Sequence, residues 1–254
     1  MKTSGNTILV TGGASGIGRE LAQRFHAQGN TVIIAGRRQE RLDEVAAAHD
    51  GIVGYALDIA DPASIDAFAE TVVRHHPEIN VLINNAGVMM FEDLTRSRDL
   101  ADAESTIATN LLGPIRLTNA LIDHLTTRPD AAIVNVTSGL AFVPLIATPT
   151  YSATKAAMHS YTVSLREALK GKVEVIELAP PAVQTELTPG QSTREGYMPL
   201  GDFMDEVMAL FSRQPTPAEI LVEKVGFLRF AEAEKRFDPT LAAVNDFARK
   251  AREG

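Results

Sequence analysis

Tyr151 and Lys155 stand four residues apart in the run Tyr151-Ser152-Ala153-Thr154-Lys155. On a helix this spacing places both side chains on one face, about one turn apart. A neighbouring ammonium stabilises phenolate, so the pair is expected to lower the tyrosine pKa from its usual value of about 10 and to act in acid/base chemistry. The same spacing also occurs by chance on exposed helix faces. The elements around the pair must decide between these interpretations.

A glycine-rich turn near the N-terminus predicts a phosphate site. Residues 7–10 are apolar, as in a strand buried on both faces, and glycines 12, 16 and 18 follow. A helical pattern then runs over residues 17–25. A strand, a glycine turn and a helix start together present free backbone N–H groups and a positive helix dipole to an anion. The alternative is a tight turn that binds nothing.

The residues after the second predicted strand, at 31–35, bear on the choice of dinucleotide. A fold that prefers NAD places a carboxylate here for the ribose 2′-hydroxyl. This chain has Gly36-Arg37-Arg38 instead, and guanidinium groups can hold a 2′-phosphate. The alternative is that both arginines are solvated at the start of a helix over 39–49. We favour NADP(H), with NAD(H) as a possible cofactor.

Further elements complete an alternating α/β pattern. Strands are predicted at 53–57, 79–83, 132–136 and 173–178, with helices between them. In an open parallel sheet, ligands bind beyond the carboxyl ends of the strands. Ser138 follows the fifth strand, thirteen residues before Tyr151. It is therefore expected near a substrate oxygen, although a serine in this position is more often only a turn former.

Three motifs together resemble the short-chain dehydrogenase/reductase family in its single-domain form. They are Thr11-Gly-x-x-x-Gly-x-Gly18, Asn84-Asn-Ala-Gly87 and Tyr151-x-x-x-Lys155, and their order and spacing match over residues 7–187. The resemblance implies one Rossmann-type domain over 1–254, with a doubly wound parallel sheet of six, possibly seven strands. It also implies hydride transfer between NADP(H) and a carbonyl or secondary alcohol.

The resemblance and the position of the sheet edge predict three sets of residues. The expected catalytic residues are Asn110, Ser138, Tyr151 and Lys155. The expected cofactor-binding residues are Gly12, Ser15, Gly16, Ile17, Gly18, Arg37, Arg38, Asp58, Ile59, Asn85, Ala86, Gly87, Tyr151, Lys155, Pro180, Val183 and Thr185. The expected substrate pocket comprises Met89, Met90, Ser138, Leu140, Phe142, Tyr151 and Leu187.

In the family scheme, Ser138 hydrogen-bonds the carbonyl oxygen and Tyr151 donates the proton. Lys155 binds the ribose and lowers the tyrosine pKa, and Asn110 holds a relay water. The chain departs from the family at Pro181, where a glycine is usual. Proline fixes φ and removes an N–H, so this loop is expected to be stiffer.

The last third of the chain is the least regular. Residues 186–215 are rich in Gly, Pro and Met and predict a mobile lid over an apolar pocket, the alternative being a surface excursion with one helix at 203–211. Residues 216–219 form a capping box that predicts a helix burying Ile220, Leu221, Val225 and Leu228. A further helix is predicted over 237–252. Because the tail that often builds tetramers is absent, we expect a homodimer.

Composition excludes several classes of function. The chain has 254 residues, a net charge of −8 and no cysteine. The negative charge argues against nucleic acid or an anionic membrane as partner, and disulfides and thiolate sites are impossible. No histidine has a second ligand at metal spacing, so no metal is assigned. Without a signal peptide or an apolar run of membrane-spanning length, a cytoplasmic protein is expected.

The sequence thus predicts an NADP(H)-dependent ketone or aldehyde reductase, or alcohol dehydrogenase. The predicted pocket walls at 88–90 and 141–143 are apolar and lack an arginine clamp, which favours a hydrophobic small-molecule substrate. The alternative is a non-catalytic, NADP-binding redox sensor, although such proteins tend to lose part of the Ser–Tyr–Lys set. An epimerase or dehydratase of the extended family type would need a larger C-terminal domain.

Overall fold

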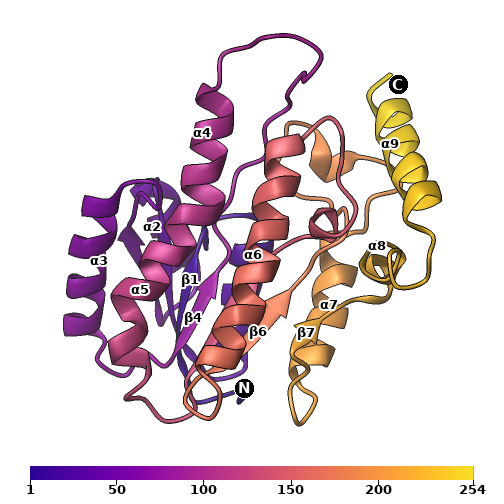
Figure 1. Cartoon of the computed structure of the whole chain (residues 1–254). Coiled ribbons are helices and arrows are strands. Elements are labelled where there is room, and N and C mark those ends of the chain that lie inside the picture. Colours follow the sequence, from indigo (N-terminus) through magenta and orange to yellow (C-terminus); the bar gives the residue numbers. More distant parts are fainter. Residues whose placement is uncertain (254) are drawn as a thin grey trace.

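Seven parallel strands lie in the order β3-β2-β1-β4-β5-β6-β7 in this computed structural model, which describes residues 1–253 (Figure 1). The strands are β1 Thr7–Thr11, β2 Thr31–Gly36, β3 Ile52–Ala56, β4 Val81–Asn84, β5 Ala132–Val136, β6 Glu174–Leu178 and β7 Glu219–Ile220. The strand order reverses between β1 and β4, which leaves a crevice beyond their carboxyl ends. The predicted doubly wound parallel α/β sheet is confirmed.

Helices cover both faces of the sheet (Figure 1). The helices are α1 Gly16–Ala27, α2 Gln39–Ala48, α3 Pro62–His75, α4 Ala101–Ile107, α5 Gly113–Leu125, α6 Pro149–Ala168, α7 Leu200–Phe211, α8 Gly226–Arg229 and α9 Phe237–Glu253. Helices α1, α2 and α7 bury side chains in the core cluster on one face, and α3, α5 and α6 bury theirs on the other.

The central strands are apolar throughout because both of their faces are buried. In β1, Ile8 and Val10 belong to one core cluster and Leu9 to the other. Leu9 is aligned with Ile33 of β2 and Leu82 of β4, which also belong to the second cluster. This register brings the carboxyl ends of β1, β4 and β5, and hence the loops that follow them, to one edge.

The prediction of a lid over 186–215 is wrong for its second half. Helix α7 lies in the core, with Phe203, Met204 and Phe211 buried, and the Phe211 ring packs edge-on against Phe25 of α1 at a centroid distance of 5.4 Å. Its Met and Phe residues therefore serve packing against the sheet. Residues 186–199 contain one 3-10 turn, Gln191–Thr193, and contribute Met198 to the core cluster that α7 joins.

The helix predicted from the capping box at 216–219 does not form there. Glu219–Ile220 joins the sheet as β7, since the N–H of Glu177 donates to Ala218 and that of Ala179 to Ile220. The open edge of β6 supplies hydrogen-bonding groups, and Ile220 is fully buried, so edge pairing outweighs the local capping signal. Helical structure resumes only at 223–225 and in α8.

The helix predicted over 237–252 is present as α9. It lies at the end of the sheet where β5 and β6 terminate, beside the loop that leads into α6 (Figure 1). None of the helices within residues 1–253 combines the length and the apolar character that crossing a bilayer requires.

Candidate active site

Two adjoining hollows open at the carboxyl edge of the sheet. The larger is a cleft of about 460 Å³ whose walls are the glycine turn, the ends of β4 and β5 and the loop after β6. The second is an apolar cavity of about 440 Å³ that reaches under α8 and α9. Ser138, Tyr151, Met89 and Leu187 line both, so these residues lie at the junction.

The glycine turn between β1 and α1 forms one end of the cleft. Gly12 has a φ of 69°, which favours glycine, and a Cβ at Gly18 would lie only 2.3 Å from Asn85 Nδ2. Gly18 does not line the cleft. Its lack of a side chain allows Asn85 to pack against the turn and to donate to the Thr11 carbonyl at 2.9 Å. The Ser15 side chain makes no capping bond, which leaves the first N–H groups of α1 available for an anion.

Arg37 and Arg38 line the cleft at its far end, after β2. Within the described chain, neither guanidinium has an acidic partner within ion-pair distance. Ile59 lines a small adjoining hollow, whereas the Asp58 carboxylate turns back to accept from the Ala60 N–H at 3.0 Å. Two cations without carboxylate partners suit a phosphate group. Asp58 does not line either hollow.

Helix α6 carries Tyr151 and Lys155 on one face. The Lys155 ammonium lies 5.6 Å from the centre of the Tyr151 ring and donates to the Val136 carbonyl at 2.8 Å. The Ser138 side chain hydrogen-bonds the Tyr151 side chain. The spacing in sequence thus corresponds to a buried cluster in the structure, because both α6 residues and Ser138 are buried at the end of β5.

Burial governs the pKa values of this pair. Loss of hydration raises the Tyr151 pKa to about 12, against a smaller lowering by the hydrogen bond to Ser138, and lowers the Lys155 pKa to about 8. The pKa of Tyr151 is thus raised, opposite to the lowering expected from Lys155, because burial of the phenol dominates. The ammonium hydrogen-bonds the Val136 carbonyl rather than the phenol. Lowering of the tyrosine pKa by Lys155 with a dinucleotide bound stays a prediction.

Asn110 lies in a single π-helical turn, Ala108–Leu112, between α4 and α5. Its buried amide pairs with the backbone of Val88, accepting from the N–H at 2.8 Å and donating to the carbonyl at 2.8 Å. A Cβ on Gly87 would stand 3.2 Å from Asn110 Oδ1 and 3.8 Å from Lys155 Nζ. Glycine at 87 therefore allows Asn110 and the lysine to approach the same backbone segment. π-turns of this kind occur frequently at functional sites.

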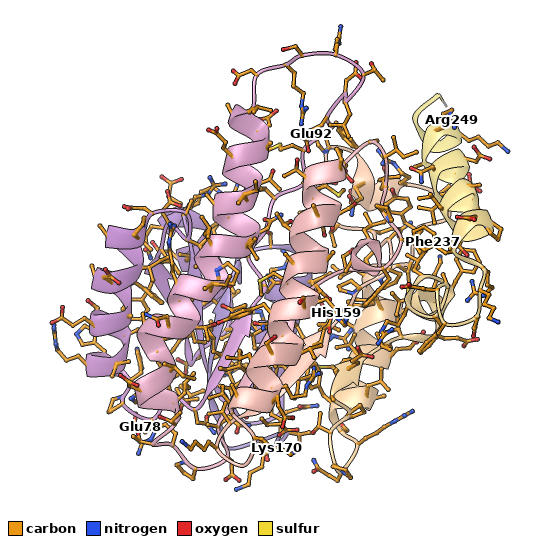
Figure 2. The ribbon with its side chains drawn as sticks, viewed as in Figure 1. Glu78, Glu92, His159, Lys170, Phe237 and Arg249 are labelled. Carbon is orange, nitrogen blue, oxygen red and sulfur yellow. The ribbon has the colours of Figure 1, made fainter. Side chains whose placement is uncertain are left out.

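Glu92 ties the loop after β4 to the N-terminal end of α6 (Figure 2). Its almost fully buried carboxylate accepts from the Thr150 N–H at 3.0 Å, from the Thr150 hydroxyl at 2.8 Å and from Arg98 at 2.5 Å. Burial raises the pKa of this carboxyl, but the hydrogen bonds from Arg98 and Thr150 together lower it below its ordinary value. This contact has no signal in the sequence, because the two segments are remote in the chain.

The loop after β6 forms the wall between the two hollows. Pro180 and Pro181 line both, and the Pro180 carbonyl accepts from the Gly139 N–H at 2.8 Å. Buried Gln191 donates to the Val183 carbonyl at 2.9 Å and to the Thr185 hydroxyl at 3.2 Å. This glutamine was not identified from the sequence, since a polar residue in an irregular segment gives no local signal.

Most of the predicted pocket residues lie at the apolar cavity, but two do not. Met90 lines only the larger cleft. Phe142 turns away from both hollows, with its ring 4.9 Å from that of His159 and 4.7 Å from the Arg229 guanidinium. The sequence missed a wall that α8 and α9 supply through Phe227, Leu228, Ala243, Val244, Phe247 and Ala248. The i, i+1, i+4, i+5 spacing on α9 marks one helix face, although the surface that this face contacts cannot be read from the spacing.

His159, Glu177 and Glu219 gather beneath Phe142, with their ligand atoms within 4.8 Å of one another. Each group already has a protein partner. Glu177 is fully buried and accepts from Thr137 at 2.6 Å and binds His159 at 2.8 Å, and Glu219 pairs with Arg229 at 3.0 Å. Protein groups therefore balance these charges, and we assign no metal here.

Comparison with known proteins gives a consistent result. The model of the short chain dehydrogenase family matches residues 6–196. An uncharacterized oxidoreductase DltE of Bacillus subtilis (strain 168) is 40% identical over 235 residues, covering 91% of this chain and 93% of that protein. Two solved structures are similar in fold. The first is 3-ketoacyl-(acyl-carrier-protein) reductase of Brucella melitensis complexed with NADH, with a TM-score of 0.77 and 27% identity, covering 86% of this chain and 96% of that one. The second is the closed form of serine dehydrogenase complexed with NADP+, with a TM-score of 0.74 and 28% identity, covering 84% of this chain and 90% of that one.

Proposed function

The chain belongs to the short-chain dehydrogenase family of oxidoreductases, and on that premise we propose that it interconverts a carbonyl and a secondary or primary alcohol with NADP(H) as cofactor. One observation carries the proposal. Ser138 and Tyr151 lie at the junction of a cleft suited to a dinucleotide and an apolar cavity suited to a small molecule. A reacting oxygen at that junction would contact both hydroxyl groups.

The residues of the cleft fit a dinucleotide. The uncapped start of α1 would hold the pyrophosphate, and Arg37 and Arg38 would hold a 2′-phosphate. Lys155, Asn85 and Thr185 would contact the part nearest the junction. When bound, the nicotinamide supplies or accepts the hydride.

The residues of this chain supply orientation and protons. Ser138 would donate a hydrogen bond to the carbonyl oxygen, and Tyr151 would donate a proton to the same oxygen in the direction of reduction. At neutral pH a pKa of about 12 keeps the phenol protonated, which is the form that an acid requires. A cationic ring bound beside the phenol would lower this pKa and so favour the reverse, oxidative direction. Asn110 would maintain the path by which the proton is replaced.

The preference for NADP(H) over NAD(H) rests on the two arginines. Glu186 is the one carboxylate among the described residues that line the cleft, and it accepts a hydrogen bond from the Ser192 hydroxyl. Both guanidinium groups lack acidic partners among the described residues, and no described carboxylate lines the small hollow that they also border. A bound 2′-phosphate would gain charge-assisted hydrogen bonds that NAD(H) cannot form. The apolar walls of the second cavity favour a substrate with a substantial hydrocarbon part.

We further propose that residues 1–254 form one domain and that the active form is a homodimer. Apolar side chains of Ile107, Leu112 and Val163, on the neighbouring segments from α4 to α6, are between 38% and 47% exposed. A second copy covering this face would remove that surface from water.

The proposal is tested by supplying the purified chain with a panel of apolar ketones and aldehydes, with NADPH and NADH in parallel, and following the absorbance of the reduced cofactor. Consumption of NADPH that depends on a carbonyl, and exceeds that of NADH, is expected. A clear preference for NADH would overturn the arginine argument. Tight NADPH binding without turnover across the panel would favour the non-catalytic redox sensor instead.

A further inference from the structure

The apolar cavity beside Tyr151 extends away from the cofactor cleft toward the C-terminal part of the chain. Its outer wall consists of α8 and the inward face of α9, together with Gly196 and Tyr197. None of the described side chains of α8 or α9 lines the cofactor cleft. A substrate whose carbonyl lies at Tyr151 would therefore direct the rest of its length along this wall.

Helix α9 is fixed in place by polar and aromatic contacts. Asn245 is buried, and its side chain accepts from the Ile146 N–H at 2.7 Å and donates to the Pro144 carbonyl at 3.2 Å. The Phe247 ring stacks on Tyr197 with centroids 6.1 Å apart. Because the loop that Asn245 holds leads directly into α6, the wall has a defined position relative to Tyr151.

Lys224 is the one charged side chain among the described residues that line this cavity. Its ammonium donates to the Gly196 carbonyl at 2.7 Å, and no described carboxylate lies within ion-pair distance of it. Gly196 itself abuts α9, since a Cβ there would stand 2.9 Å from the Phe247 ring. The ammonium therefore lies at the rim of the cavity, beside the segment that packs against Phe247 of α9. Lys224 does not line the cofactor cleft.

We propose that the substrate is an elongated carbonyl compound with an anionic group at the end remote from the carbonyl. This inference rests on the proposed function. The carbonyl would lie between Ser138 and Tyr151, a hydrocarbon segment would contact Phe227 and the α9 face, and a carboxylate or similar anion would pair with Lys224 at the rim. The apolar walls offer the middle of such a molecule no hydrogen bonds and therefore select hydrocarbon there. A cation without an acidic partner beside an otherwise apolar cavity selects a negative end group.

The inference differs from the expectation based on sequence. The absence of an arginine clamp from the predicted walls favoured an uncharged hydrophobic substrate. Lys224 follows β7, in a segment for which a buried helix was expected, so its position at the cavity was not foreseen.

The test compares aliphatic ω-oxo carboxylic acids of increasing chain length with their methyl esters, using NADPH. For one range of lengths, kcat/KM for the acid should exceed that for the ester by about three- to five-fold, as for an ion pair with an exposed lysine. The difference should appear in KM rather than in kcat, because a contact remote from the reacting oxygen stabilises substrate and transition state alike.

Two variants assign the effect to one lysine. Lys224→Gln should lower kcat/KM for the acid to the value for the ester and so remove the preference. Lys172→Gln removes the same charge from an exposed position before β6, outside the cavity, and should keep the preference. Equal rates for acid and ester in the unmodified protein, or an unchanged preference in Lys224→Gln, would overturn the inference while leaving the proposed function intact. Absence of turnover with every carbonyl would overturn the proposed function and this inference with it.

Discussion

Glu92 accepts hydrogen bonds from both the backbone N–H and the hydroxyl of Thr150, the residue directly before Tyr151. A carboxylate on the loop after β4 thereby satisfies a free N–H in the first turn of α6, where the helix dipole also favours negative charge. The same loop carries Met89, which lines both hollows. Glu92 thus couples the position of the loop beside the site to the position of the helix that carries the phenol.

Replacing Glu92 by Ala should lower the free energy of unfolding by about 1–3 kcal/mol, because it leaves the Thr150 N–H and the Arg98 guanidinium without their acceptor. Since the folded pKa of Glu92 is lowered, its contribution is present above the unfolded pKa of about 4.3 and is lost as pH falls through the folded value. Denaturant unfolding of both proteins across acidic pH should therefore show their difference shrinking toward low pH. A difference in the free energy of unfolding that stays constant with pH would contradict an ionised carboxylate at this position. Glu92→Gln retains an acceptor oxygen and should therefore lose less stability than Glu92→Ala.

Replacing Tyr151 by Phe should reduce carbonyl reduction by about 10²- to 10⁴-fold, the range expected for loss of a general acid. The substitution removes only the hydroxyl that bonds Ser138 and keeps the buried ring, so the fold should persist. NADPH affinity, measured by fluorescence titration, should stay nearly the same. Unchanged turnover in the variant would reject Tyr151 as the proton donor.

Lys155 should make the protein more stable toward high pH. Its pKa is about 8 when folded and about 10.5 when unfolded, so the unfolded state holds more protons between these values and the free energy of unfolding rises with pH there. Relative to Lys155→Met, the stability of the unmodified protein should increase by on the order of 3 kcal/mol from pH 8 to pH 10.5, with no dinucleotide added. The raised pKa of Tyr151 lowers the free energy of unfolding as pH rises above about 10, but Tyr151 is present in both proteins, so its effect cancels in the comparison. A flat difference over this window would contradict a buried ammonium.

The arginine pair should set the cofactor preference. Replacing Arg37 and Arg38 together by Ala should raise the KM for NADPH by about 10- to 100-fold, as expected for loss of hydrogen bonds to a charged group, and leave the KM for NADH nearly unchanged. Arg41→Ala is the matched control, because Arg41 is exposed on α2, pairs with Glu44 at 3.3 Å and does not line the cleft. An equal loss for both cofactors would contradict recognition of a 2′-phosphate.

Two adjacent alanines of α9 offer a sharp test of the cavity wall. Both are exposed, but Ala243 lines the cavity and Ala242 does not. Ala243→Phe should therefore raise the KM of long substrates several-fold while sparing short ones, and Ala242→Phe should change neither. Steady-state kinetics over a chain-length series separates the two variants. The same effect in both would indicate a general disturbance of α9 rather than a filled cavity.

The elements that build the cofactor cleft were predictable because they rest on local physics. A strand buried on both faces is an apolar run, as in β1, and the close approach of Asn85 to the α1 turn tolerates only glycine at position 18. The i, i+4 spacing of Tyr151 and Lys155 likewise needs only a helix. These signals do not depend on which distant segment the element contacts.

The remainder depends on contacts between remote segments. The capping box at 216–219 was a valid local signal, yet the edge of β6 required a partner and Ile220 became fully buried. Phe142 is apolar and follows Ser138 closely, but the Arg229 guanidinium offers it a cation–π contact. The direction of the Tyr151 pKa could not be read from the spacing, because spacing places a cation nearby without showing that the phenol is buried. The hydrogen bonds from Thr150 to Glu92 and the position of Lys224 at the edge of the cavity leave no signal in the neighbouring sequence.

Helix α9 has one consequence for how the substrate range of such a protein can change. Every described residue that lines the cofactor cleft comes before position 192, whereas the cavity wall formed by α8 and α9 comes after it. The side-chain hydrogen bonds from α9 to remote segments of the described chain run through Asn245. Under the proposed function, exchanging this helix while retaining the asparagine would therefore change the substrate without altering a described residue of the cofactor cleft.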